Sequence, residues 1–279
     1  MKTNIFLWNV FRANGEKIFS HIILTGVLAL ITAVPALADF NYPDFTSING
    51  LNLVGSAEQN GNRIRLTTAN MELAGATWYL TKQSVQNGFH TNFQFQISNW
   101  SSPPADGFAF VIQNQSQTAL GGGGGAIGYG GPTLSDGIEN SVAVEFDTYY
   151  NYEFPEPDTP HISVQTRGML PNSPLHDYSL GSTTNISNFV DDNIHTGTMN
   201  YIPGTLSISL DNNIVLEVTL DLSSTLSLEN GYAWVGFTAG TGLYYENHDI
   251  LNWSFESIPE PASLLLFALG GLTVLRRRK

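Results

Sequence analysis

Residues 142 to 161 read VAVEFDTYYNYEFPEPDTPH, and this stretch decides the fold. Its first half alternates between apolar and acidic side chains. Successive side chains of a β-strand point to opposite faces, so Glu145 and Asp147 share one face while Val144 and Phe146 enter the core on the other. The stretch therefore predicts a strand that projects two carboxylates together from one face of a sheet.

The same alternation recurs through the middle of the chain, in segments rich in aromatic and β-branched residues. No long segment has helical periodicity, and turn-forming clusters at 59–62, 211–213 and 229–231 separate the segments. This pattern predicts an all-β fold, an antiparallel β-sandwich of jelly-roll type, in a single domain. Residues 168–198 are polar and contain two prolines, and we expect them to form an irregular excursion. The alternating segments are 92–97, 108–112, 142–146, 205–210, 215–220 and 233–237.

The composition excludes several classes of protein. The 279 residues contain no cysteine, which excludes a disulfide-stapled domain, thiolate metal sites and thiol nucleophiles. The formal net charge is −13, and the interval from Asp39 to Ile258 holds 22 acidic residues against four basic ones, a net charge of −18. Such a surface repels phosphate, so nucleic acid is not the partner, and a metal ion or a neutral ligand suits it better. The four basic residues are Arg63, Arg65, Lys82 and Arg167.

The first 38 residues have the three parts of a secretory signal peptide. Basic residues are scattered through 1–17, an apolar stretch covers 18–34, and the small-residue motif Ala-Leu-Ala occupies 36–38. We therefore expect cleavage after Ala38 and export across the inner membrane. A membrane anchor that stays uncut is the alternative.

The C-terminal end carries a second targeting signal. Pro-Glu-Pro at 259–261 precedes an apolar segment at 262–275 and four basic residues at 276–279. The apolar segment has 14 residues, too few for a comfortable membrane helix, which needs about 20. The order of the three parts resembles the PEP-CTERM sorting signal of bacteria with two membranes, in which a membrane protease removes the tail after transient anchoring. The resemblance implies release to the cell envelope, the outer surface or the extracellular matrix, with an ordinary tail anchor as the alternative. In either case the mature domain is expected to span 39–258 and to work outside the cytoplasm.

Several acidic side chains cluster at the end of this strand and in the loop after it, and their mutual repulsion requires a cation. The proline-rich loop 155–160 would bring Glu156, Asp158 and His161 back toward the acid pair of the strand. Two carboxylates about 4 Å apart repel each other by roughly 4 kcal/mol at an effective dielectric constant of about 20, and no lysine or arginine is nearby in sequence. Oxygen ligands from Asp, Asn and a backbone carbonyl suit Ca²⁺, whereas three carboxylates and one imidazole suit Mn²⁺ or another transition ion. We therefore predict a two-metal cluster, and an exposed acidic loop after an edge strand is the alternative.

Four motifs resemble the legume or L-type lectins and stand in the same order along the chain as in that family. The run 144–151, with His161 sixteen positions after Glu145, is similar to the metal loop of that family. The likeness covers nearly all of 39–257 and implies a concanavalin-like jelly roll. The other three motifs are 105–110 (ADGFAF), the glycine loop 121–128 and the segment 236–255.

The resemblance assigns metal-binding roles to residues of the metal loop. Glu145, Asp147 and His161 match the transition-metal ligands of the family. Asp147, the backbone carbonyl of Tyr149, and Asn151 match the calcium ligands.

One position departs from the family pattern. Where the family usually has an aspartate that bridges both ions, this chain has Glu156, with Asp158 two residues later. The longer arm of Glu156 can still ligate, or Asp158 takes over if the loop is threaded differently. Both residues therefore stay candidates for the bridging ligand.

The same resemblance implies a shallow sugar site beside the calcium ion. Asp106, on a cis peptide bond after Ala105, accepts hydrogen bonds from two sugar hydroxyls, and a glycine amide, for which we favour Gly125, donates one. Asn151 donates its side-chain amide, and the ring of Tyr149 provides an apolar platform for the C–H face of a sugar. Calcium then positions these groups and takes no part in chemistry.

The family's variable specificity loop falls at Gly242, Leu243 and Tyr244. We expect these residues to border the sugar. Packing within the domain accounts equally well for the two adjacent tyrosines, Tyr244 and Tyr245, and is the alternative.

The predicted function is that of an exported bacterial carbohydrate-binding protein, which recognises a glycan or exopolysaccharide with the help of metal ions and is not an enzyme. The main rival is a glycoside hydrolase of family 16, whose strand carries Glu-x-Asp-x-Glu or Glu-x-Asp-x-x-Glu. Glu145 and Asp147 begin that pattern, but positions 149 and 150 are both Tyr, so the second catalytic carboxyl is missing. A structural matrix or adhesion protein with a decayed sugar site is the other alternative. Family members often dimerise through sheet edges, so a homodimer is one expected assembly.

Overall fold

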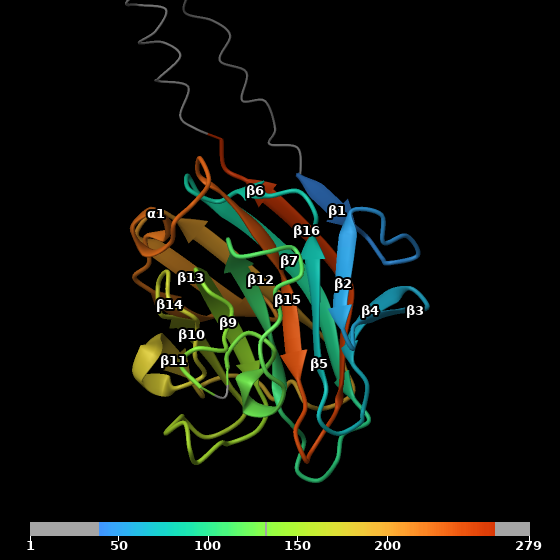
Figure 1. Cartoon of the computed structure of the whole chain (residues 1–279). Coiled ribbons are helices and arrows are strands. Elements are labelled where there is room, and N and C mark those ends of the chain that lie inside the picture. Colours follow the sequence, from blue (N-terminus) through green and yellow to red (C-terminus); the bar gives the residue numbers. More distant parts are fainter. Residues whose placement is uncertain (1–38, 132, 260–279) are drawn as a thin grey trace, which may run out of the picture. The chain divides into compact units, whose positions relative to one another are not determined.

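Two antiparallel β-sheets packed face to face form the domain (Figure 1). The computed structural model describes residues 39–131 and 133–259. The predicted signal peptide, and the apolar and basic parts of the predicted C-terminal signal, lie outside the described residues. Among the residues that are described, none of the helices is both long and apolar enough to span a membrane.

One sheet, which we call the back sheet, has a continuous path of seven strands and one further strand at its side. Its two longest strands run side by side through its middle, with Phe89 opposite Ser257 and Ser98 opposite Asn247. In order across the sheet, the strands are β14 (Asn213–Val218), β13 (Thr205–Leu210), β12 (Ile194–Ile202), β7 (Phe89–Ser98), β16 (Asn247–Ser257), β4 (Arg63–Thr67) and β3 (Glu58–Asn60), with β1 (Phe40–Tyr42) paired to β16.

The other sheet, the front sheet, is built in the same way. In order across it, the strands are β11 (Ser179–Thr183), β10 (His161–Thr166), β9 (Ser141–Asp147), β8 (Gly107–Gln113), β15 (Tyr232–Gly240), β5 (Ala74–Tyr79) and β2 (Leu51–Gly55), with β6 (Gln83–Ser84) paired to β15. The helical elements described are α1 (Leu222–Thr225) and two 3-10 turns, η1 (Gly124–Ala126) and η2 (His176–Tyr178).

The predicted sandwich is confirmed. Five of the six alternating segments lie within β7, β8, β9, β13 and β15, and the sixth, 215–220, begins in β14 and runs two residues past its end. The prediction for 168–198 was wrong in part, because this stretch contains β11 and the start of β12. The inward positions at the start of β12 are His195 and Gly197, which hide the apolar alternation. Gly197 is required there, since a Cβ atom would lie 2.5 Å from the ring of Phe93 on the neighbouring strand.

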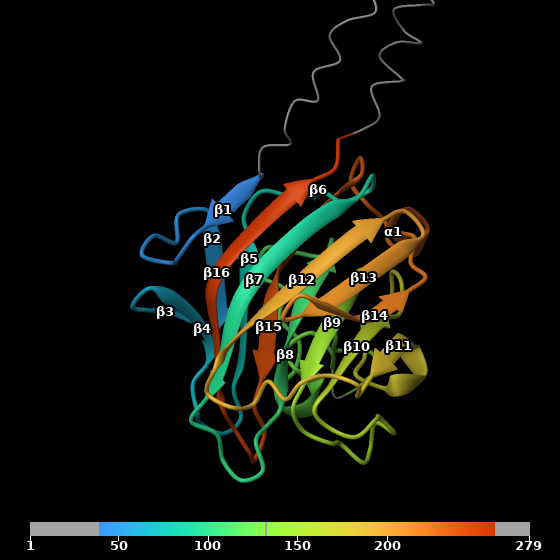
Figure 2. The same cartoon turned by 180° about the vertical axis from the view of Figure 1, so that it is seen from behind.

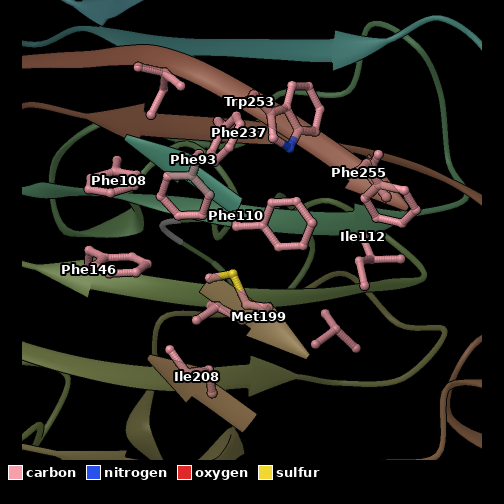
Figure 3. Close-up of a cluster of buried hydrophobic side chains, with 14 of the residues drawn as sticks. Phe93, Phe108, Phe110, Ile112, Phe146, Met199, Ile208, Phe237, Trp253 and Phe255 are labelled. Carbon is pink, nitrogen blue, oxygen red and sulfur yellow. The ribbon is translucent and has the colours of Figure 1, made fainter. Parts of the chain in front are cut away.

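Aromatic side chains fill the space between the two sheets (Figure 3). The rings of Phe108 and Phe146, from adjacent strands of the front sheet, stack at a centroid distance of 4.7 Å. Phe93 and Trp253 of the back sheet meet Phe237 of the front sheet edge to face, at 4.8 and 4.9 Å. These edge-to-face and stacked pairs are the arrangements that aromatic rings prefer, and they fix the two sheets against each other.

A second, smaller apolar cluster covers the outer face of the front sheet. Trp78 and Val111 of the sheet pack there against Ile127 and Tyr129 of the glycine-rich loop. All residues of β8 and β9 are therefore buried, on both faces of the sheet. The face that carries Glu145 and Asp147 is thus covered by a loop, which places these two carboxylates in the interior.

The predicted site and the two ends of the domain lie at opposite ends of the sandwich (Figures 1 and 2). Asp39 and Ser257 lie together, because a carboxylate oxygen of Asp39 accepts a hydrogen bond from the backbone N–H of Ser257 at 3.0 Å. The site loops adjoin the other end, where β9 stops at Asp147 and β16 starts at Asn247. The eleven residues of β16 span the distance between the two ends.

A buried histidine joins β12 to two acidic side chains. His195 contacts Asp211 through Nδ1 at 2.8 Å and Asp191 through Nε2 at 2.9 Å. Burial alone would lower the pKa of His195, but the hydrogen bonds to these two carboxylates outweigh it and raise the pKa. The charged imidazolium is therefore the form that the folded protein favours.

We expect this cluster to make stability depend on pH. A raised pKa in the folded state stabilises the fold fully below the unfolded-state value, near 6.5, and this stabilisation is lost as the pH rises through the folded-state pKa. His195→Gln should remove that dependence, so the difference in Tm between wild type and variant should shrink by roughly 2–4 °C, equivalent to about 1 kcal/mol, between pH 6 and pH 9. Thermal denaturation of both proteins over this pH range, with excess Ca²⁺ and Mn²⁺, measures the difference in Tm. His90→Gln is the matched control, since His90 contacts the neutral Asn200, and an equal pH effect in both variants contradicts the prediction.

Candidate metal and sugar site

The strand register of the front sheet places predicted metal ligands on the adjacent strands β9 and β10. Asp147 on β9 lies opposite His161 on β10 and opposite Gly107 on β8. Two pairs further along the strands, and on the same face, Glu145 lies opposite Ser163. Side chains opposite each other on adjacent strands point to the same face, so Asp147 and His161 meet directly.

Three of the predicted ligands form a compact group, the acid–histidine group, of Asp147, Glu156 and His161. Each offers one ligand atom, and these atoms all lie within 4.8 Å of one another. Glu156 reaches the group from the loop after β9, and one of its oxygens accepts the backbone N–H of Asn151. Asp158 is exposed and does not belong to this group. Of the two candidates for the bridging position, the loop thus brings Glu156 to the other ligands.

The electrostatics of the acid–histidine group fit a divalent cation. Burial, and then the charges of Glu156 and Glu145, raise the pKa of Asp147 far above its usual value. Burial is also the largest cause that raises the pKa of Glu156 to about 8. Burial and the nearby His176 lower the pKa of His161 to about 4, so its imidazole is neutral at pH 7, as a metal ligand must be. Buried carboxylates with no basic side chain among them are stable as anions only when a cation compensates them.

Glu145 has a different environment from the other predicted ligands. One carboxylate oxygen accepts a hydrogen bond from the hydroxyl of Tyr129, and the other accepts hydrogen bonds from Ser163 and Gln165. Burial raises the pKa of Glu145, while these donors oppose the rise. Its carboxylate lies beside the acid–histidine group but outside the set of atoms that are within 4.8 Å of one another. Its role as a metal ligand stays a prediction from the family resemblance.

Several buried polar atoms of the predicted site have no hydrogen-bond partner among the described residues. They include Oδ1 of Asn151, Oδ2 of Asp106 and Nδ1 of His161. An unpaired buried oxygen or nitrogen costs about 1–3 kcal/mol, so such atoms usually have a ligand, an ion or water as partner. The predicted calcium ligand Asn151 and the predicted sugar ligand Asp106 both have this property.

Asp106 is held in place by the backbone on both sides of its side chain. The peptide bond between Ala105 and Asp106 is cis, as expected. The Asp106 N–H donates to the carbonyl of Gly240 at 3.2 Å, and its carbonyl accepts the N–H of Thr148 at 3.0 Å. Burial raises the pKa of the Asp106 carboxyl to about 7, although the nearby backbone N–H of Gly242 opposes this. The fold therefore fixes one carboxylate oxygen beside the specificity loop.

The other predicted sugar residues gather around Asp106 and Asn151. A Cβ atom at Gly125 would lie 2.5 Å from Oδ1 of Asn151, so only glycine lets the loop approach this side chain. A Cβ atom at Gly242 would lie 3.3 Å from Oδ2 of Asp106.

Two tyrosines mark the rim of the site. The rings of Tyr149 and Tyr244 lie 5.5 Å apart, and the side chain of Leu243 next to them is 74% exposed. The specificity loop thus borders the platform tyrosine with apolar surface open to solvent. The structure thus shows that Tyr244 packs against Tyr149, while its role at the sugar stays a prediction.

Sequence reasoning missed one buried acid behind the site. Glu246 accepts a hydrogen bond from the hydroxyl of Thr148 at 2.6 Å and contacts Nε2 of His248 at 2.8 Å. His248 in turn contacts the hydroxyl of Thr67 at 2.6 Å. This chain of contacts joins the metal loop to β16 and β4. The spacing Glu246-x-His248, with one titratable group directly before β16 and the other on it, is the signal that could have found it.

Comparisons with known proteins agree with this geometry. The legume lectin β-barrel domain matches residues 41–253, and the PEP-CTERM protein-sorting motif matches residues 257–279. Lectin-4 of Griffonia simplicifolia is 27% identical over 243 residues, which are 78% of this chain and 96% of that protein. A mannose/glucose-specific lectin of Centrolobium tomentosum is 29% identical over 209 residues, which are 72% of this chain and 81% of that protein.

A solved structure shows the same architecture. The lectin from Bauhinia forficata in complex with GalNAc is 30% identical, with a TM-score of 0.67 and coverage of 78% of this chain and 97% of that chain. The relatives named here are lectins, so the chain is a binding protein and not an enzyme. The sorting motif points to export and to a location in the cell envelope or outside the cell. The chain belongs to the legume, or L-type, lectin family and carries a PEP-CTERM sorting motif behind its lectin domain.

Proposed function

We propose that this protein is an exported bacterial lectin that binds a neutral glycan or exopolysaccharide through a site organised by Ca²⁺ and by Mn²⁺ or another divalent transition ion. One observation carries the proposal. The acid–histidine group, with Asp147 and His161 buried and Glu156 half-buried, lies next to the unpaired oxygens of Asn151 and Asp106. No lysine or arginine of the described residues forms an ion pair with it. A structural protein with a decayed sugar site has no need for such a costly arrangement.

Two overlapping sets of residues would hold the two ions. Asp147, Glu156 and His161 hold the transition ion together with Glu145, and Asp147, the carbonyl of Tyr149 and Asn151 hold calcium. The ions supply positive charge that lets these carboxylates remain ionised in the interior. Thr148 transmits the position of the metal loop to Asp106 through the hydrogen bond between its N–H and the Asp106 carbonyl, at 3.0 Å.

The sugar is held by a small set of polar groups beside an apolar platform. We infer that Asp106 accepts two sugar hydroxyls, that the Gly125 amide and the Asn151 side chain each donate one hydrogen bond, and that the ring of Tyr149 packs on the sugar's C–H face. Leu243 and Tyr244 then border the sugar from the specificity loop.

The charge of the domain favours a neutral ligand. Arg63 and Arg65 both pair with Asp249, and Lys82 pairs with Glu229. Arg167 donates to the carbonyls of Leu134 and Pro171, both at 2.8 Å. Three of the four basic side chains between 39 and 258 are thus paired with carboxylates, and the fourth is held by backbone carbonyls. The large excess of acidic residues repels a polyanionic polysaccharide. The GalNAc complex of the Bauhinia lectin and the mannose/glucose specificity of the Centrolobium lectin also point to neutral sugars.

The position of the site suits a protein held by its C-terminal tail. The described domain ends beside Ser257, at the end of the sandwich opposite the site loops (Figure 1). A tail anchored in the inner membrane would leave the sugar site facing away from the attachment point. We propose that the protein recognises glycan in the envelope or the extracellular matrix, and a homodimer through sheet edges stays a prediction.

The test is the affinity of the Asp106→Ala protein for a sugar found on an array of neutral glycans. We expect at least a tenfold loss of affinity, since hydrogen bonds to a charged group contribute about 1.5–3 kcal/mol each, with a Tm close to that of the wild type. Isothermal titration calorimetry with Ca²⁺ and Mn²⁺ measures the affinity.

Asp177→Ala, at an exposed acid in η2, is the matched control and should bind normally. Unchanged sugar affinity in the Asp106→Ala protein would contradict the proposed site. A reducing-sugar assay on the same glycans tests for hydrolysis, and released reducing ends would show that the protein is an enzyme. If neither binding nor hydrolysis is detected, a structural role is what remains.

A further inference from the structure

Glu246 is a completely buried acid that belongs to neither set of metal ligands and to none of the sugar ligands assigned above. One of its oxygens, Oε1, accepts the hydroxyl of Thr148 at 2.6 Å and contacts Nε2 of His248 at 2.8 Å. The other, Oε2, is buried and has no hydrogen-bond partner among the described residues. Burial of a carboxylate whose only ion-pair partner among those residues is a histidine does not favour stability, which points to a role in the site.

Thr148 is the residue through which Glu246 reaches the sugar site. It lies in the chain between two predicted metal ligands, Asp147 and Tyr149. Its backbone N–H donates to the carbonyl of Asp106 at 3.0 Å, and its buried hydroxyl donates to Glu246. Thr148 therefore links the metal loop to the main sugar ligand, and Glu246 fixes the side chain of this link.

The contacts of Glu246 continue into the back sheet. His248 on β16 lies opposite Thr67 on β4, and its Nδ1 contacts the Thr67 hydroxyl at 2.6 Å. A carboxylate only accepts hydrogen bonds, so Nε2 of His248 carries the hydrogen that faces Glu246. His248 and Thr67 lie on regular strands, whereas Thr148 lies in the loop directly after β9. Glu246 thus ties the metal loop to the framework of the sandwich.

The position of Asp106 depends on few contacts. Two backbone hydrogen bonds hold this residue among those described, one to the carbonyl of Gly240 at the end of β15 and one from Thr148. A binding site must hold its groups within about 0.5 Å of the productive geometry, so the loss of either bond matters for the ligand. The bond from Thr148 comes from a loop residue, and Glu246 is the partner that orients this residue.

We propose that Glu246 is a positioning residue of the sugar site, which holds Asp106 in its binding position through Thr148. This inference rests on the proposed function and adds a residue to it. The affinity of the cation-loaded protein for its sugar then depends on a group that contacts neither the ions nor the sugar.

The experiment measures the sugar affinity of the full-length protein at saturating Ca²⁺ and Mn²⁺, by isothermal titration calorimetry. The probe is the tightest binder among N-acetylgalactosamine, methyl α-D-galactoside, methyl α-D-mannoside and the neutral glycans of the array. Glu246→Leu removes the acceptor and should lower the affinity roughly five- to twentyfold, because Asp106 is held less precisely. Thr148→Val removes the donor but keeps the shape of the side chain, and it should lower the affinity roughly three- to tenfold. It also covers the case in which Glu246→Leu fails to fold.

Two conservative variants separate positioning from a general loss of structure. Glu246→Gln keeps an oxygen where Thr148 and His248 need one and places its NH₂ group at the unpaired position of Oε2. Thr148→Ser keeps the hydroxyl. Both should bind the sugar within roughly threefold of the wild type, since the hydrogen bond to Oε1 is retained.

Thr91→Val is the matched control for the loss of a buried threonine hydroxyl. This hydroxyl donates to the carbonyl of Ser254 at 2.8 Å and accepts the indole N–H of Trp253 at 3.0 Å. Thr91 lies opposite Phe255, near the end of the sandwich that is remote from the site. The variant should lower the Tm and leave the sugar affinity unchanged.

Hydrogen exchange measures the contact itself, without any sugar. The amide N–H of Thr148 should exchange at least roughly fivefold faster in Glu246→Leu than in the cation-loaded wild type, because its bond to the Asp106 carbonyl opens more often. In Glu246→Gln it should exchange near the wild-type rate. Amide-resolved NMR or fragmentation mass spectrometry provides these rates.

The outcomes separate this inference from the proposed function. Wild-type sugar affinity in both Glu246→Leu and Thr148→Val overturns the inference and leaves the lectin function in place. A loss that Glu246→Gln and Thr148→Ser share, or that Thr91→Val reproduces, overturns it in the same way. If the wild type binds no sugar of the probe set, the proposed function fails and this inference fails with it.

Discussion

Removal of divalent cations is expected to abolish sugar binding and to lower the Tm of the protein by roughly 5–10 °C. A ligand at one hundred times its Kd stabilises the folded state by about 2.7 kcal/mol, and 1 kcal/mol shifts the Tm of a domain of this size by about 2–4 °C. Without cations, the buried Asp147 and the half-buried Glu156 lie beside each other and repel when both are ionised. Asn151 and the metal loop then lose the positions from which they support Asp106.

The stability of the cation-free protein should also depend on pH. Burial is the first cause that raises the pKa of Asp147 and Glu156 above their unfolded-state values, for Glu156 to about 8. A raised pKa contributes stability below the unfolded-state value, near 4, that is lost as the pH rises through the folded-state pKa. The cation-free protein should therefore become less stable between pH 5 and pH 8, and the cation-loaded protein should not. Calorimetric Tm values with EDTA, and with Ca²⁺ and Mn²⁺ restored, measure this.

Matched variants identify the ligands behind the effect. Asp147→Asn should lose the cation-dependent rise in Tm, whereas Asp158→Asn, at an exposed acid outside the acid–histidine group, should keep it. Glu156→Gln should resemble Asp147→Asn. The reverse result for Glu156 and Asp158 would transfer the bridging role to Asp158. Sugar binding and a Tm that EDTA leaves unchanged would contradict the metal site altogether.

Asp249→Ala should lower the free energy of unfolding by about 3–5 kcal/mol, the range for a buried ion pair that loses one partner. The Asp249 side chain is completely buried, and Arg65 binds it with two hydrogen bonds of 2.8 Å, from Nε and from one terminal guanidinium nitrogen. Arg63 adds a contact at 3.2 Å. Without the carboxylate, the guanidinium groups of Arg63 and Arg65 on β4 repel each other, so the Tm should fall by roughly 6–20 °C.

Urea denaturation compares this variant with a mild change and with a repaired one. Glu217→Ala removes an exposed acid on β14 that accepts a hydrogen bond from Ser207, and it should cost less than about 1 kcal/mol. The double variant with Asp249→Leu and Arg65→Met replaces the pair by apolar side chains and should recover part of the loss. A cost for Asp249→Ala that is no larger than the cost for Glu217→Ala would show that the ion pair contributes little.

Much of the fold and part of the site were predictable from local patterns. Alternation at 142–146 placed Glu145 and Asp147 on one face, and these residues do lie on the same face of β9. The first turns of β12 escaped prediction, because His195 and Gly197 occupy inward positions that are usually apolar. The spacing of Glu246 and His248 was visible in the chain, but their link to Thr148 depends on a contact across 98 residues.

The sequence by itself determined the strands, the shared face of the acid pair and the C-terminal sorting motif, because backbone alternation and short motifs are local properties. Only the tertiary structure decided that His161 lies opposite Asp147, that Glu156 and not Asp158 reaches them, and that Glu246 contacts Thr148. Strand register and the approach of distant loops are set by the packing of the whole core, which no local pattern encodes.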